Sequence, residues 1–88
     1  MDILEMAIEK YGEKQLDQAQ EELAELIVAI SKYKRNVSKL TTANVIEEIA
    51  DVRIMLKQVM MLLNIEEFQI KNEELYKLNR LKKRLEVK

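Results

Sequence analysis

Residues 13–37, EKQLDQAQEELAELIVAISKYKRNV, decide the fold that this sequence predicts. Apolar residues recur in this stretch every three or four positions, which is the period of an α-helix with one broad buried face. That face carries Leu16, Ala19, Leu23, Leu26, Ile27, Ile30, Tyr33 and Val37. We therefore predict a long helix that begins near Glu13 and ends in the basic and polar residues 34–38.

The composition of the whole chain extends this prediction to an all-α fold. With one Gly and no Pro in 88 residues, the sequence lacks the signals of strands and hairpins and is rich in helix formers. Asp2 is expected to cap a short first helix that runs to about Tyr11, and Gly12 is expected to end it.

A third helix is predicted after residue 40. Thr41, Thr42 and Asn44 are alternative N-caps, and Asn44 has the spacing of a capping box with Glu47. We expect the helix to end at Asn64. Its predicted buried face carries Val45, Ile49, Val52, Leu56, Val59 and Leu63, and its predicted outer face carries Arg53, Lys57 and Asn64.

A fourth helix is predicted from about Glu66 to the C-terminus. Its inward residues are expected to be Phe68, Leu75, Leu78, Leu81 and Leu85. The chain has no internal repeat or linker, so residues 1–88 form one domain: an antiparallel bundle of about four helices, one short and three long. A helix of about 24 residues is roughly 36 Å long, which exceeds the roughly 31 Å diameter of a compact globule of this size. We therefore expect an elongated bundle that a homodimer or homotetramer completes.

Charge and composition exclude several classes of protein. The chain has no Cys, which excludes disulfides and thiol chemistry, and no apolar run is long enough to cross a membrane. Its first residues lack a secretory signal, so we expect a cytoplasmic protein. Residues 1–76 hold 9 basic and 15 acidic residues, and residues 77–88 hold 6 and 1. An acidic body with a basic end does not favour nucleic-acid binding.

Two pairs of carboxylates are the strongest functional signal. Glu22 with Glu25, and Glu48 with Asp51, are each three residues apart inside an apolar helical run, so each pair lies on one helix face. Two like charges about 5 Å apart repel by roughly 3 kcal/mol at an effective dielectric near 20, and a bound cation would remove this repulsion. Oxygen ligands without His or Cys favour Mg²⁺, with Mn²⁺ as a possible substitute, over zinc.

The position of Glu48 on the helix strengthens this signal. Glu48 shares its face with apolar residues, while Arg53 and Lys57 occupy the outer side. Acids on a buried face are unfavourable unless they are paired or bind a metal. Spacing and placement leave two interpretations open: a metal site, or salt bridges between helices, for example to Arg53 or Lys57. In the second case the chain is a non-catalytic helical interaction module.

In this order and spacing, the two acidic motifs resemble the signature of the MazG-like all-α nucleoside triphosphate pyrophosphohydrolases, an ExxE followed by an ExxD. Residues 21–26, EELAEL, match the first half, and residues 48–52, EIADV, match the second. Residues 10–16, KYGEKQL, are similar to the aromatic-Gly segment that precedes the first motif, and residues 32–35 to the basic end of that helix. The resemblance covers about residues 9–63.

The resemblance implies a metal site and a reaction. Glu22, Glu25, Glu48 and Asp51 would be the Mg²⁺ ligands. Family members hydrolyse a nucleoside triphosphate between its α and β phosphates to a nucleoside monophosphate and pyrophosphate, which removes unwanted nucleotides or controls nucleotide pools. Our choice for the general base is Glu22, because it borders the apolar face, where burial favours a raised pKa.

The resemblance also implies substrate contacts. Lys32, Lys77 and Arg80 correspond to basic positions that would bind the phosphates. Family members often stack the base on aromatic residues, and Tyr11, Tyr33 and Phe68 are the candidates in this chain, which has no Trp. The substrate stays open among those of the dUTPase-like, dCTP-specific and phosphoribosyl-ATP enzymes of the superfamily.

Overall fold

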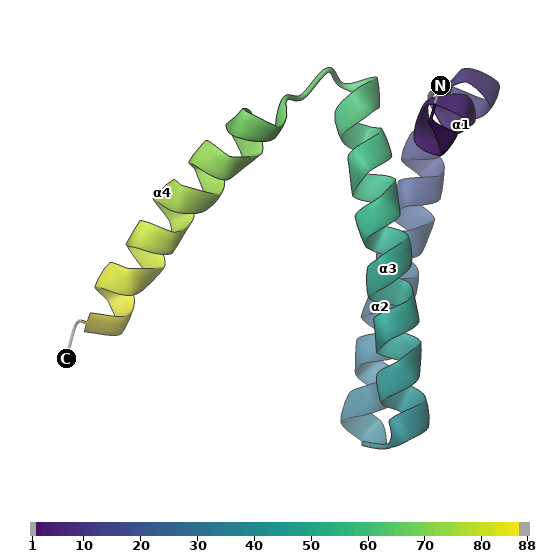
Figure 1. Cartoon of the computed structure of the whole chain (residues 1–88). Helices are drawn as coiled ribbons and strands as arrows, with labels where there is room; N and C mark the ends of the chain where they lie inside the picture. The colour runs from purple at the N-terminus through teal and green to yellow at the C-terminus, as the bar shows by residue number, and fades with distance from the viewer. Residues whose placement is uncertain (1, 87–88) are drawn as a thin grey trace.

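The computed structural model describes residues 2–86, which form four α-helices (Figure 1). They are α1 (Ile3–Tyr11), α2 (Lys14–Arg35), α3 (Lys39–Leu62) and α4 (Glu67–Glu86). Within this described range there is no strand. The prediction of an all-α protein with one short and three long helices is confirmed. The predicted fourth helix included residues 87 and 88, which lie outside the described residues.

Local signals define the short helix α1 as the sequence predicts. The Asp2 carboxylate accepts a hydrogen bond from the backbone N–H of Glu5 at 2.9 Å and so caps the first turn. At the other end, Gly12 has a φ of 58° and donates its N–H to the carbonyl of Ile8. A side chain at position 12 would be strained by this positive φ, so Gly allows the abrupt change of direction into α2.

The connection between α2 and α3 corrects the predicted start of the third helix. Ser38 is the N-cap of α3, and its side chain accepts a hydrogen bond from the backbone N–H of Thr41 at 3.1 Å. In return, the Ser38 N–H donates to the Thr41 hydroxyl at 3.0 Å. This reciprocal pair is a capping box. The predictions of an N-cap at Thr41, Thr42 or Asn44 are therefore wrong, because α3 begins at Lys39, ahead of all three residues.

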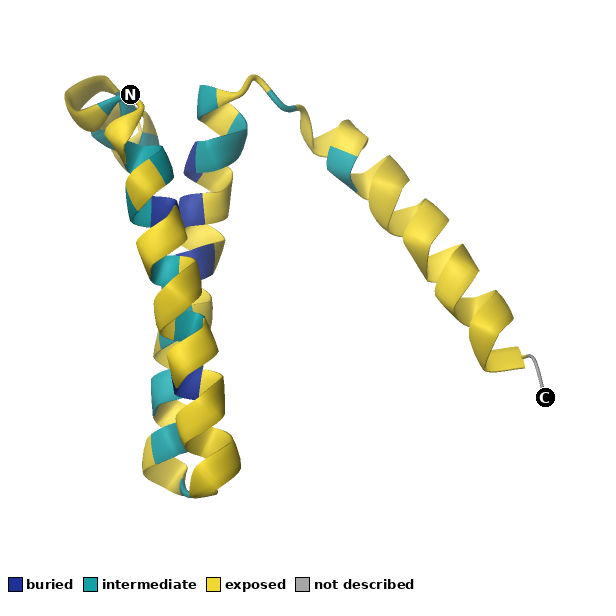
Figure 2. Ribbon diagram, turned by 180° about the vertical axis from the view of Figure 1, so that it is seen from behind, coloured by how far each residue is buried: buried dark blue, intermediate teal, exposed yellow. Residues whose placement is uncertain are grey.

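The core of the molecule is the contact between the antiparallel helices α2 and α3 (Figure 2), with α1 packed against one end of this hairpin. Its buried apolar residues are Ala19, Ala29, Val52 and Met55. Gln58 is only 3% exposed. Its carbonyl oxygen accepts a hydrogen bond from the Gln15 side chain at 2.8 Å, which satisfies the buried amide oxygen. Four apolar residues and one glutamine make a small core.

Most of the apolar residues that the sequence places inside are exposed in the single chain. On α2 these are Leu23, Ile27, Ile30 and Tyr33, with Val37 just beyond it, and on α3 and its C-cap they are Ile49, Leu56 and Leu63. The apolar arc of each helix is wider than the strip that one neighbouring helix covers, so only part of it is buried. These positions of the predicted buried faces are wrong for the single chain.

The fourth helix differs most from expectation. Helix α4 extends away from the α2–α3 hairpin and packs against no other helix of the described chain (Figure 1). Phe68, Leu75, Leu78, Leu81 and Leu85, which the sequence places inward, are all exposed. Their apolar stripe has no neighbour within the chain, and this leaves the stripe free for a partner.

The resulting shape is elongated, as expected. The chain measures 50 × 35 × 19 Å, and its radius of gyration of 16.4 Å exceeds the roughly 12 Å of a compact domain of this length. It exposes 7580 Å², whereas a compact monomer of this mass exposes about 5400 Å². An extended chain with this many exposed apolar side chains indicates oligomerisation. Within residues 2–86, no helix combines the length and the apolar character that crossing a membrane requires.

Replacing Ser38 by Ala tests the observed cap. Loss of the side-chain acceptor leaves the Thr41 N–H without its partner, which we expect to reduce the free energy of unfolding by about 1 kcal/mol. For a chain of this size the melting temperature should fall by about 4–8 °C, measured by circular dichroism. Ser31→Ala, on an exposed position inside α2, is the control and should not lower it. An equal melting temperature for S38A and the parent would contradict the cap.

Candidate metal centre

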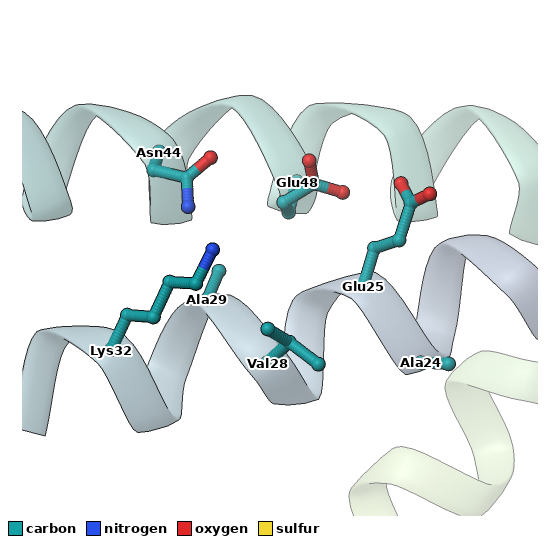
Figure 3. Close-up of a pocket in the computed structure, with 7 residues that line it drawn as sticks. All are labelled: Ala24, Glu25, Val28, Ala29, Lys32, Asn44 and Glu48. Carbon is teal, nitrogen blue, oxygen red and sulfur yellow. The ribbon is translucent and has the colours of Figure 1, made fainter.

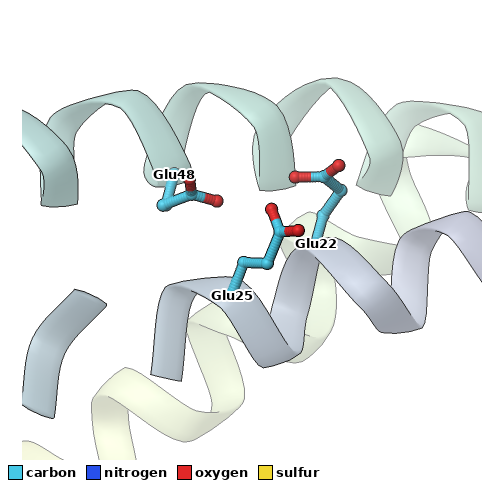
Figure 4. A group of neighbouring side chains, drawn as sticks. All are labelled: Glu22, Glu25 and Glu48. Atoms are coloured by element: carbon cyan, nitrogen blue, oxygen red, sulfur yellow. The ribbon is translucent and has the colours of Figure 1, made fainter. Parts of the chain in front are cut away.

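Three of the predicted acids meet between α2 and α3. Glu22 and Glu25 extend from α2 and Glu48 from α3 (Figure 4), and each offers a carboxylate oxygen within 4.8 Å of the others. Glu22 and Glu48 are half-buried, and Glu25 is exposed. The three-residue spacing on α2 and the antiparallel packing of the two helices thus bring three carboxylates to one place.

Asp51, the fourth predicted ligand, lies one turn beyond Glu48 on α3 and is half-buried. It does not belong to the group of three whose oxygens lie within 4.8 Å of one another. Its charge nevertheless acts on Glu22, where it contributes to a raised pKa. Asp51 therefore borders the group of three on the side of Glu22.

The two half-buried acids have unsatisfied oxygens. One oxygen of Glu22 accepts a hydrogen bond from the Gln18 side chain at 3.0 Å. The other, Oε2, is buried without a hydrogen-bond partner, and so is Oε2 of Glu48. Buried polar atoms in native proteins almost always have a partner, so two orphaned carboxylate oxygens in one group call for a ligand.

Burial is the main cause of an unusual pKa at Glu22. Removal from water raises the pKa of this carboxyl above its ordinary value of 4.5. The hydrogen bond from Gln18 lowers it in part, and the charges of Glu25 and Asp51 raise it further. Ionisation of Glu22 without a cation nearby is therefore unfavourable.

Within residues 2–86, no basic side chain forms an ion pair with the group. Across the described residues, the one ion pair is between Lys82 and Glu86 on α4, with 4.0 Å between Nζ and Oε1. The predicted alternative of salt bridges from these acids to Arg53 or Lys57 is therefore not found in residues 2–86. Both basic residues are exposed.

A groove of about 270 Å³ runs beside the acids (Figure 3), and its walls come from both helices. Its lining residues are Ala24, Glu25, Val28, Ala29, Lys32, Asn44 and Glu48. Lys32, one of the predicted phosphate contacts, thus shares the groove with two of the acids. The other two, Lys77 and Arg80, line a separate hollow on α4 with Arg84 and are not brought to the acids within the single chain.

Two residues of the site escaped the sequence-based prediction. Gln18, which binds Glu22, precedes it by four residues, and Asn44, which lines the groove, precedes Glu48 by four residues. Polar residues one helical turn from a candidate acid are a signal that could have identified both. Asn44 was instead interpreted as a helix cap.

The geometry fits a hard divalent cation. Two oxygens bound to one Mg²⁺ at about 2.1 Å lie at most about 4.2 Å apart, so oxygens within 4.8 Å need only small side-chain adjustments to share an ion. The ligands are all carboxylates, two of which have an unpartnered oxygen. Glu22, Glu25 and Glu48 are the residues that could hold a metal ion.

Comparisons with known proteins give no relative. No protein-family model, no curated protein and no solved structure matches this chain.

Substitution of Glu22 by Gln tests the electrostatics of the group. A carboxyl whose pKa is raised by folding binds more protons in the folded than in the unfolded state, so its contribution to stability is present below pH 4.5 and is lost as the pH rises through the raised pKa. We expect E22Q without metal to melt higher than the parent protein at pH 7. The difference should shrink as the pH falls towards 4.5.

The measurement is the melting temperature of both proteins in EDTA between pH 4 and pH 8. Glu21→Gln is the matched control, since Glu21 is exposed and lies outside the group of three. E21Q should melt at the temperature of the parent throughout. If E22Q were less stable than the parent at pH 7, the carboxylate of Glu22 would be stabilising the metal-free fold, contrary to this account.

Proposed function

We propose that this protein is a Mg²⁺-dependent nucleoside triphosphate pyrophosphohydrolase of the MazG-like type, which releases a nucleoside monophosphate and pyrophosphate. The observation that carries the proposal is the convergence of Glu22, Glu25 and Glu48 from two helices without a basic partner. The order and spacing of the ExxE and ExxD motifs, which resemble those of that family, supply the reaction.

The proposed roles follow from position and charge. Glu22, Glu25 and Glu48 hold the ion, with Asp51 as the fourth ligand beside Glu22. When bound, Mg²⁺ would neutralise phosphate charge and lower the pKa of a bound water. Oε2 of Glu22 is the proposed acceptor of the proton from the attacking water, because this buried oxygen has no hydrogen-bond partner and belongs to the group of three acids.

Substrate contacts are assigned by the same reasoning. Lys32 lines the groove beside Glu25 and Glu48, so it is the proposed phosphate contact within the chain. Lys77 and Arg80 are also proposed to bind phosphate, which requires that α4 of another copy reach the groove. The nucleotide base is left unassigned.

A second candidate is a non-catalytic helical interaction module. The exposed apolar residues of all three long helices favour it, because they indicate assembly whether or not the protein is an enzyme. The two candidates differ in what Mg²⁺ does. An interaction module is not expected to bind Mg²⁺ at the group of three acids.

Metal binding is tested by thermal unfolding with increasing Mg²⁺. A ligand that binds only the folded state stabilises it by about 2.7 kcal/mol at a hundred times its dissociation constant, so the melting temperature of the parent should rise. Glu48→Gln should abolish most of this rise, because it removes the only member of the group on α3. Glu47→Gln, an exposed neighbour on the same helix, should retain it. Equal responses of E48Q and E47Q would favour the interaction module.

Activity is tested with a panel of common and modified nucleoside triphosphates and a pyrophosphate detector. We expect release of pyrophosphate and nucleoside monophosphate in equal amounts, and only with Mg²⁺ or Mn²⁺. E48Q should lose at least about 100-fold in rate, since even residues behind the ligands of a metal site contribute up to that factor. E47Q, purified in parallel, should match the parent. Release of inorganic phosphate in place of pyrophosphate, or no release from any nucleotide, would refute the proposed reaction.

A further inference from the structure

Helix α4 is held away from its own hairpin by the turn that precedes it. Asn64 has a left-handed φ of 54°, the Ile65 N–H donates to the carbonyl of Met60 at 2.9 Å, and the Asn64 N–H donates to that of Met61 at 3.4 Å. This pattern is a Schellman motif. The Glu66 N–H then donates to the Gln69 side chain at 2.8 Å. Hydrogen bonds thus fix both ends of a short connection, so the direction of α4 is set locally.

The surface of α4 has an apolar stripe with a basic edge. Leu75, Leu78, Leu81 and Leu85 are spaced by three and four residues and are all exposed. Lys77 and Arg84 lie beside Leu78 and Leu81, where these side chains and Glu74 form a hollow. Neither Lys77 nor Arg84 has an ion-pair partner among residues 2–86. The helix therefore presents leucines, the basic side chains of Lys77 and Arg84 and the single acid Glu74 to the same neighbour.

The outer side of α2 presents the complementary surface, which we call the α2 outer face. It consists of Leu23, Ala24, Ile27 and Val28, all exposed. The exposed acids Glu21 and Glu25 precede Val28 by seven and three residues, so they lie next to each other on one edge of this face. The exposed bases Lys14 and Lys32 lie on the same edge, seven residues before Glu21 and seven after Glu25. Ala24 and Val28 also line the groove beside Glu25 and Glu48 (Figure 3). The stretch of this edge that carries Glu21 and Glu25, which we call its acidic edge, is thus the rim of the candidate metal centre.

We infer that α4 of one copy docks on the α2 outer face of a second copy, and that the second copy returns the same contact. The leucines of α4 cover Leu23, Ile27 and Val28, and the basic edge of α4 meets the acidic edge of α2. Two identical contacts related by a two-fold axis close a dimer. Because the connection to α4 points it outward, the hairpin that it reaches belongs to another chain.

The exposed area agrees with a dimer of this kind. Each chain exposes about 2200 Å² more than a compact monomer of its mass. Burying that excess on two copies would remove about 4400 Å² in total, which lies within the range of obligate homodimers, roughly 2000–5000 Å². The docked helix of each copy is α4, which packs against no other helix of the described chain.

The docking would complete the candidate site. The groove of about 270 Å³ is smaller than most ligand pockets, which run from roughly 300 to 1000 Å³, and Lys32 is the one basic residue in its lining. A docked α4 adds a wall and brings Lys77 and Arg84 to the acidic rim. Arg80, the other proposed phosphate contact of α4, lies over the Tyr76 ring on the far side from the leucines and is not brought there by this contact. This supply of cations to a phosphate-bearing substrate rests on the proposed function, whereas the docking itself rests on burial and charge.

The test is the mass of full-length protein in solution by analytical ultracentrifugation at micromolar concentrations. The parent protein should be a dimer. Ile27→Asp, on the α2 outer face, and Leu78→Asp, on α4, should each weaken the dimer by at least about tenfold, because a charge is placed in an apolar contact. The side chains are 66% and 61% exposed in the single chain, so neither change disturbs its core.

Two controls match these variants. Ile46→Asp changes a side chain that is 63% exposed on α3, and Tyr76→Asp one that is 58% exposed on the opposite face of α4 from the leucines. Both should remain dimers. If I27D and L78D stayed dimeric, or if the controls dissociated equally, the assigned surfaces would be wrong. A monomeric parent protein would overturn the proposal.

A mixture of the two variants decides which surfaces meet. A pair of one I27D chain and one L78D chain retains one intact contact, between α4 of the first and α2 of the second. We therefore expect the mixture to form dimers at concentrations where each variant alone is monomeric. Pairing of α2 with α2, or of α4 with α4, gives no such recovery, and its absence would refute the exchange. The readout is mass, so it is independent of whether the protein hydrolyses nucleotides.

Discussion

Carboxylates held between two helices without a counter-charge are the constraint on which this structure depends. Small residues at Ala19 and Ala29 let α2 approach α3 closely, and the same approach brings Glu22 and Glu25 to Glu48. Two like charges about 5 Å apart repel by roughly 3 kcal/mol at an effective dielectric near 20, and solvent around the exposed Glu25 screens part of the repulsion within this group. The packing of the hairpin and the ionisation of its acids therefore oppose each other, and a bound cation would remove this opposition.

The small apolar core also indicates that the chain needs a partner. Four apolar residues are buried, while most of the remaining apolar residues of α2 and α3 and the whole stripe of α4 are exposed. Burial of an apolar side chain contributes about 1.5–3 kcal/mol, so covering even a few of these residues would add as much stability as the present core supplies. The α2–α3 hairpin alone leaves its acids without a counter-charge and much of its apolar surface exposed to water. A bound cation would remove the first cost, and assembly with another chain would remove the second.

How far the sequence predicted this structure depended on whether the signal was local. Asp2 and Gly12 defined α1 because each acts through hydrogen bonds to residues within one turn. The start of α3 was misassigned because Ser38, Thr41, Thr42 and Asn44 are all good caps, and the choice among them depends on the reciprocal bonds that Ser38 and Thr41 form. The inward residues of α4 were wrong for a different reason. Periodicity identifies an apolar stripe, but it does not say which chain covers it.

In the candidate site, too, local signals were predicted from the sequence and contacts between distant parts were not. The three-residue spacing placed Glu22 and Glu25 on one face, and their meeting with Glu48 required only that α2 and α3 be antiparallel neighbours. The positions of Lys77 and Arg80 relative to the acids depend on where α4 docks, which no spacing within the chain determines. The roles of all these residues stay predictions, because a residue's role is defined by its contact with a bound metal or substrate.

Charge balance in the groove connects the metal centre to the assembly. One Mg²⁺ and Lys32 together carry three positive charges, one fewer than the negative charges of Glu22, Glu25, Glu48 and the proposed fourth ligand Asp51 when all four are ionised. A triphosphate would add several negative charges to a groove that has no further cation of its own chain in its lining. Close charges of one sign disfavour binding unless others compensate them. The basic edge of α4 from a second copy would supply such charge in the proposed dimer. An assembled dimer would therefore bind an anionic substrate better than a single chain with the same metal.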